Sequence, residues 1–283
     1  MEHLHGLFKN VNMKKCGLII ILIIINCQVF AKSDDKIILR LKYSVASKIY
    51  LTGSHRNDLY VLDVGTQQTF FYSFIEKQRD SAMRELIKQG YSGMPLMLEL
   101  QERGFVQGSK SGLKRDKANK LLYDYDLIGT KRYVTKDITF DWNWHITNKE
   151  LEILGYKCYF ATSEYAGRKW FAWFCPSIPI DCGPWKLYGL PGAILKAYDG
   201  EMHYTFDCVE IIKPNVNFDC GFFDNFKEIK KEDFKKLKRQ SLTNPYLFLY
   251  NQKGVKISKG YHKDGTPIDF SKYTNLKYNP IEK

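Results

Sequence analysis

The cysteines and histidines of this chain could bind a metal ion. A structural zinc site needs paired ligands at short spacing, and the sequence contains no C-x-x-C and no H-x-x-x-H. Cys175, Cys182, Met202 and His203 could gather around one hairpin as ligands for copper or another soft metal. Because a single histidine on a strand is more often a surface residue, we expect no metal site.

Nucleophilic catalysis would need a serine or cysteine beside a base that an acid orients. Several histidines supply bases, yet no serine lies in a G-x-S-x-G elbow and no cysteine has sequence neighbours that would lower its pKa. Asp181, Asp199 and Asp207 could form a carboxylate pair, although strand ends and turns commonly collect aspartate. We therefore expect no catalytic residue and no cofactor. A thiol-dependent enzyme or a metal-handling protein is the alternative.

A connector between two strand-like runs is the most distinctive stretch of the chain. Glycines and prolines recur from Pro176 to Gly192 and forbid a helix there. Leu190-Pro191-Gly192 predicts a type II turn, since proline presets its own φ and glycine takes the positive φ that this turn requires. A phosphate-binding loop would need a helix after the turn, whereas the next residues alternate like a strand. The pattern favours a structural role for the motif.

The strand before this connector is apolar on both faces. Trp170, Ala172 and Phe174 share one face, and Trp173 and Cys175 lie on the other. Such a strand must be covered twice, by the body of the protein and by a helix, a loop or a partner. We therefore predict that ligand or partner binding involves the following residues: Trp173, Trp185, Leu190, Pro191 and Gly192.

The same region carries a family resemblance. The block "AWFCPSIPIDCGPWKLYGLPGAILKAYD", with Trp144, "GYKC" and "GRKW" before it, resembles the GLPGLI family of exported proteins from the Bacteroidota. The resemblance covers most of the chain and implies export, but it implies no established activity, cofactor or catalytic residue. Ala193 stands where the family motif usually has leucine, and Cys175 and Cys182 occupy loop positions that often hold other residues.

The N-terminus predicts export independently. Two lysines at 14 and 15 precede an apolar run over 17–25, and Val29-Phe30-Ala31 suits a signal peptidase, so residues 1–31 are interpreted as a signal peptide. The run is short for a membrane helix, so we expect no transmembrane segment after processing. A retained anchor, a lipoprotein modified at Cys27 and a true start at Met13 rather than Met1 remain alternatives.

Export bears on the cysteines, because disulfides persist in oxidising compartments. The mature chain keeps five cysteines, so at least one disulfide is expected and one thiol is left over. The leading pair is Cys175 with Cys182, which would close a short loop at the start of the connector. The competing pair joins Cys158 or Cys208 to another strand. The candidates are Cys158, Cys175, Cys182, Cys208 and Cys220.

The formal charge of +12 does not indicate nucleic acid as a partner. Much of the excess lies in "KEIKKEDFKKLKRQ" over 227–240, where Phe226, Ile229, Phe234 and Leu237 recur at near-helical spacing. This predicts an amphipathic helix with a solvated lysine face. No stacking motif or known nucleic-acid fold accompanies the charge.

The remaining pattern predicts a mainly β fold: a curved antiparallel sheet or half-barrel with one or two helices. Alternation indicates strands over 37–50, 59–64 and 69–74, and again from about residue 121 at intervals of roughly ten residues. A helix is expected over 80–88 with Asp80 as its N-cap, and the polar stretch 109–120 is expected to be an exposed loop. Residues 32–283 form one domain in this interpretation.

We therefore expect an exported protein, periplasmic or outer-membrane-associated. Its predicted role is a non-catalytic binding or envelope-assembly module, with an envelope protein, a peptide or a lipid as partner. Its mature length is sufficient for one large β-rich domain with its own core.

Overall fold

A computed structural model describes residues 35–48, 55–214, 216–218, 223, 225–253, 266, 267, 269 and 274–282 of the chain. The chain divides into two units, Met1–Asp34 and Asp35–Lys283, and all of the described residues belong to the second. The predicted signal peptide and Cys220 lie outside the described residues. No helix within the described ranges has the length and apolar character needed to span a membrane.

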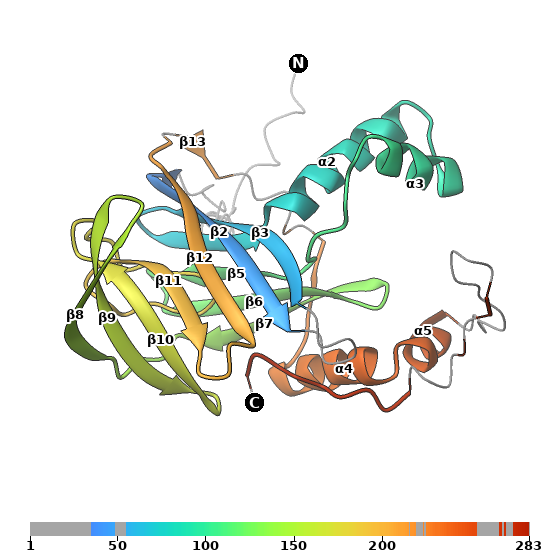
Figure 1. Cartoon of the computed structure of the whole chain (residues 1–283). Coiled ribbons are helices and arrows are strands. Elements are labelled where there is room, and N and C mark those ends of the chain that lie inside the picture. Colours follow the sequence, from blue (N-terminus) through green and yellow to red (C-terminus); the bar gives the residue numbers. More distant parts are fainter. Residues whose placement is uncertain are drawn as a thin grey trace, which may run out of the picture. The chain divides into compact units, whose positions relative to one another are not determined.

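One large sheet dominates the described chain (Figure 1). It is antiparallel except at β14, which pairs in parallel with β7, and its ends do not close into a barrel. The order β14-β7-β6-β5-β4-β3-β2-β12-β11-β10-β9-β8 shows that mostly consecutive strands are neighbours. The strands are β2 (Leu39–Lys48), β3 (His55–Val64), β4 (Gln68–Ser73), β5 (Gly112–Asp116), β6 (Leu121–Ile128), β7 (Lys131–Ile138), β8 (His145–Ile153), β9 (Tyr156–Tyr165), β10 (Arg168–Cys175), β11 (Ala193–Asp199), β12 (Tyr204–Ile212) and β14 (Lys227–Glu228).

The mainly β prediction is confirmed, and alternation explains why. Along β2 the inward side chains Leu39, Leu41 and Tyr43 are almost fully buried, while Arg40 and Lys42 between them remain partly exposed. A short ladder of β1 (Lys36–Ile37) with β13 (Val216–Asn217) forms a separate two-stranded sheet.

The predicted loop over 109–120 is wrong in its centre, where β5 pairs with β4 and β6. Leu113 is the one large apolar residue that β5 buries, and its other side chains are polar. A strand with so few apolar residues carries little alternation, so the stretch resembles a loop in sequence.

Two helices follow β4. α2 (Phe74–Lys88) begins earlier than predicted, because Ser73 rather than Asp80 is its N-cap: the Ser73 hydroxyl accepts a 3.0 Å hydrogen bond from the Glu76 amide. Asp80 lies inside the helix and pairs with Arg84. α3 (Gly93–Glu102) packs on α2 around Leu86.

Two further helices lie near the C-terminus, so the described residues hold four helices rather than one or two. α4 (Lys231–Thr243) contains the predicted amphipathic face, although the residues just before it form β14 instead of its first turn. α4 lies across β6 and β7, with α5 (Pro245–Lys253) following it, and the end of the chain runs beside α4 (Figure 1). Phe234 is buried between α4 and the sheet.

Candidate functional site

A cavity of about 670 Å³ lies between one face of the sheet, α4 and the last residues of the chain. The strand register explains its wall, because cross-strand partners point to the same face of a sheet. Two such rows meet the cavity, and they are Phe206, Val45 and Asp58 on β12, β2 and β3, and Phe71, Leu113, Asp124 and Thr135 on β4 to β7.

The floor of the cavity is aromatic. Tyr60 stacks on Phe71 with ring centroids 4.6 Å apart, and Phe71 meets the edge of Phe206 at 6.2 Å. Trp185 extends this surface and packs on the fully buried Trp170 at 5.2 Å. Ligand pockets typically have a volume of roughly 300–1,000 Å³ and an apolar lining with a few fixed polar groups, and this cavity has that character.

One cluster of polar residues in the wall is centred on Asp58. Its carboxylate accepts hydrogen bonds from the Ser73 hydroxyl at 2.8 Å and from the Ser109 amide at 2.7 Å. Burial raises the pKa of Asp58 in spite of these bonds, and it also raises the pKa of the Tyr60 hydroxyl, which lies 3.5 Å from Ser111. These groups satisfy one another, so they form a rigid polar margin beside the aromatic floor.

Lys186 is a buried cation at the opposite side. It pairs with Asp124 at 3.4 Å and with Glu282 from the end of the chain. Burial alone would lower the pKa of Lys186, but these two carboxylates outweigh burial and raise it, so the ammonium stays charged. Glu282 also lies 3.3 Å from Lys235 on α4. The charges therefore tie the connector, β6, α4 and the C-terminus together around the cavity.

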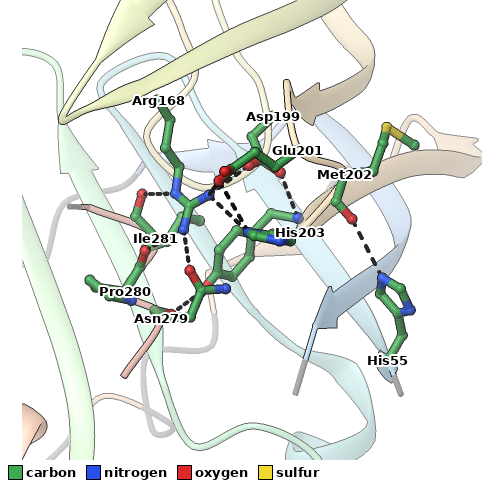
Figure 2. Close-up of polar contacts among 10 residues, drawn as sticks. His55, Arg168, Asp199, Glu201, Met202, His203, Asn279, Pro280 and Ile281 are labelled. Carbon is green, nitrogen blue, oxygen red and sulfur yellow. Dashed lines mark hydrogen bonds and ion pairs between the residues drawn. The ribbon is translucent and has the colours of Figure 1, made fainter. Parts of the chain in front are cut away.

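The last residues, 278–282, which we term the C-terminal strap, form part of the cavity wall. The Arg168 side chain, 1% exposed, holds them: it donates to the Ile281 and Pro280 carbonyls at 3.1 and 2.7 Å and to Asn279 Oδ1 at 2.5 Å (Figure 2). On its other side the guanidinium pairs with Asp199, at 2.6 Å. A planar guanidinium suits this task because it offers several donors in fixed directions.

Asp199, Glu201 and His203 form the one group of three possible metal ligands found in the described part of the chain. Arg168 Nη1 lies 2.6, 3.4 and 3.4 Å from these three side chains (Figure 2). A guanidinium in this position neutralises the carboxylates and repels a metal cation, so the arrangement does not fit a metal site. Cys175 and Cys182, which the soft-metal alternative included as ligands, do not belong to this group.

The predicted binding residues are not brought together. Trp185 lines the cavity. Trp173 lies on the opposite face of β10 from Trp170 and packs on Phe160 at 4.8 Å. Leu190 is buried in the core.

Pro191 is exposed in the turn and Gly192 is buried. The turn is tighter than the predicted type II turn, because the Gly192 amide donates to the Leu190 carbonyl at 2.8 Å across Pro191 alone.

The connector is held in place from outside. Trp142 Nε1 donates to the Lys186 carbonyl at 2.9 Å, and Trp144 Nε1 donates to the Tyr188 carbonyl at 2.8 Å. These two indoles stack on each other at 4.7 Å. The connector is therefore a structural element that places Trp185 and Lys186 in the cavity wall.

The described cysteines are free and buried, so the predicted Cys175–Cys182 bridge is wrong here. Cys175 instead contacts Cys158, because β9 and β10 pair Tyr159 with Phe174 and the next positions oppose each other. Burial raises the pKa of the Cys158, Cys182 and Cys208 thiols to about 12. A thiol with this pKa is a poor nucleophile, because the thiolate is the reactive form.

The cationic side of the cavity was not predicted from the sequence. Part of the lysine face of α4, expected to be solvated, lines the cavity instead. The signal was present, because residues 231, 234, 235, 238 and 242 follow the i, i+3, i+4, i+7 spacing of one helix face. Lys238 also pairs with Asp126 at 2.7 Å, and although burial opposes its charge, Asp126 and Asp124 raise its pKa.

Comparison with known proteins gives a fold and no more. No model of a known protein family matches the chain, and neither does any curated protein. The structure is similar to PNGF-II in its C2 crystal form, with 13% identity and a TM-score of 0.50, over 74% of this chain and 33% of that one. The P21 form gives 14% identity and a TM-score of 0.49, over 72% and 33%. This chain spans about a third of the PNGF-II chain, and the likeness extends to the fold alone.

Proposed function

We propose that the protein is an exported, non-catalytic binding module of the GLPGLI type that takes a small, largely apolar ligand into the cavity. The observation that carries this proposal is the cavity itself, with its aromatic floor of Tyr60, Phe71 and Phe206. Displacement of water from such an apolar surface by an apolar ligand lowers the free energy and so favours binding. Of the partners expected from the sequence, a lipid suits such a lining best.

The proposal places the protein in the periplasm or at the outer membrane. Its support is the predicted signal peptide over residues 1–31 together with the GLPGLI resemblance of the connector. Proteins of the cell envelope work close to lipids, and the cavity on the face of the sheet has an apolar lining that suits acyl chains.

The thiol-dependent alternative finds less support. A thiol mechanism needs an accessible thiolate, whereas Cys158, Cys182 and Cys208 are buried with raised pKa values. The metal-handling alternative also has less support, because the Arg168 guanidinium lies beside Asp199 in the candidate group of metal ligands. Binding in the cavity is consequently the function that we put forward.

A neutral apolar dye, N-phenyl-1-naphthylamine, tests the proposal. Its fluorescence should rise on addition of the protein and saturate at one dye per chain. Leu242→Asp places a charge at the cavity rim and should weaken dye affinity about tenfold. Leu247→Asp is the matched control, because Leu242 and Leu247 are 51% and 56% exposed but only Leu242 lines the cavity. An equal effect of both changes, or no saturable binding, would refute the proposal.

A further inference from the structure

Two hydrogen-bond donors in the cavity wall have no partner among the described residues. They are the Thr135 hydroxyl on β7, in a side chain that is 5% exposed, and the Asn279 amide nitrogen on the C-terminal strap. The oxygen of Asn279 accepts from Arg168, and its nitrogen points away from the guanidinium (Figure 2). Buried polar groups in folded proteins are nearly always hydrogen-bonded. These two donors therefore indicate a ligand that supplies oxygen acceptors.

The charge around the cavity is unequal. Seven lysine and arginine side chains line it, against four carboxylates. The carboxylates are already engaged: Asp124 and Glu282 with Lys186, Asp137 with Lys231, and Asp58 with its hydroxyl and amide donors.

Two cations of this excess lie on α4. Lys236 and Arg239 line the cavity and are exposed, and neither has a carboxylate within ion-pair distance in the part of the chain that the structure describes. Their neighbours Lys231, Lys235 and Lys238 all have such partners. A ligand entering beside α4 therefore meets positive charge that no carboxylate of the described residues neutralises.

We propose that the cavity binds an amphiphile with an oxyanion head group, a carboxylate or a phosphate on an apolar chain. This inference rests on the proposed function and specifies its ligand. The apolar chain lies on Phe71 and Phe206, and the head group accepts hydrogen bonds from Thr135 and Asn279 in the field of Lys236 and Arg239. Hydrogen bonds to a charged acceptor are stronger than those between neutral groups, so the head group adds affinity to the apolar contact.

Isothermal titration of the full chain with a matched series of ligands tests this. Dodecanoate, dodecyl phosphate and dodecanol share one chain and differ in the head, and each is used below the concentration at which it aggregates. Both oxyanions, or one of them, should bind about tenfold or more tightly than the alcohol. The tighter of the two identifies the head group.

The outcomes separate the two proposals. Equal affinity for all three ligands would overturn the oxyanion inference and leave the apolar binding function standing. No binding of any of them, together with no dye binding, would overturn both.

Variants localise the effect. Thr135→Val removes the hydroxyl at nearly constant volume, and because that hydroxyl has no partner among the residues that the structure describes, the fold should be retained. It should weaken oxyanion binding several-fold and leave dodecanol binding unchanged. The double variant Lys236→Gln, Arg239→Gln should do the same. The control Lys136→Gln, Lys213→Gln removes two exposed cations that do not line the cavity, and should change neither affinity. Unchanged oxyanion affinity in both test variants would overturn the inference.

Discussion

At the residue scale, a single guanidinium joins parts of the chain that are far apart in sequence. Arg168 is positioned by β10, pairs with Asp199 at the end of β11 and holds three backbone or side-chain oxygens of the C-terminal strap. Its charge is buried with that of its carboxylate partner, so removal of one leaves the other uncompensated. Such a pair is costly to break even where it contributes little net stability when intact.

Arg168→Met should therefore destabilise the protein by about 3–5 kcal/mol, because Asp199 keeps a buried charge without its cation. Urea unfolding monitored by tryptophan fluorescence measures the change. Lys169→Met, an exposed neighbour on the same strand, is the control and should change stability by less than about 0.5 kcal/mol. Similar changes in both variants would contradict the stabilising role assigned to the Arg168–Asp199 pair.

The buried thiols impose a pH dependence. The folded state holds the pKa of Cys158, Cys182 and Cys208 at about 12, above the ordinary value of 9.0. Between these values the unfolded chain has released the thiol protons and the folded chain has kept them. Stability should be fully present below about pH 9 and fall as the pH rises toward 12, by about 1.4 kcal/mol per pH unit for each thiol.

Urea unfolding in the presence of a reductant, from about pH 9 to about pH 11, measures this slope. Cys208→Ala should reduce it by one thiol's contribution, whereas Ser44→Ala, on the β2 strand that pairs with β12, should leave it unchanged. A slope that does not respond to Cys208→Ala would mean that this thiol ionises equally in both states.

At the element scale, the connector between β10 and β11 is where glycine is indispensable. A Cβ on Gly192 would lie 2.2 Å from the Cys175 carbonyl oxygen, a distance that backbone atoms cannot relieve without moving. Gly192→Ala should destabilise the protein by about 2 kcal/mol or more, measured by thermal or urea unfolding. Gly200→Ala is the matched control, because its nearest atom would be 3.6 Å away. Equal stability of the two variants would show that the connector backbone moves to accept a Cβ at residue 192 at little cost.

Strands and helices were predictable where their apolar residues recur at the period of two or of about 3.6 that each element requires. The strand after the connector, β11, and the inward face of β2 follow from the apolar period, whereas β5 was missed because Leu113 is its one large apolar residue. The start of α2 was missed although Ser73 and Glu76 have the spacing of a capping box, because the aromatic run of β4 continues into the helix.

At the scale of the whole molecule, the cavity could not have been predicted. Its wall joins β2 near the beginning of the described chain to Glu282 at its end. Local periodicity shows which face of an element is apolar, but it does not show which distant elements meet that face. The lysine-rich face of α4 looks solvated in sequence, and only the packing of α4 beside the strap places part of it in the cavity.

The excess positive charge of the molecule and of its cavity yields a last prediction. Screening lengths shrink from about 30 Å to about 8 Å between 0.01 M and 0.15 M salt, so the affinity for dodecanoate or dodecyl phosphate should fall several-fold over this range. The affinity for dodecanol should stay constant, because its binding is apolar. Titrations at the two salt concentrations measure both. The Lys236→Gln, Arg239→Gln variant should lose most of the salt dependence, and parallel behaviour of the charged and neutral ligands would mean that the cavity recognises the chain and not the head.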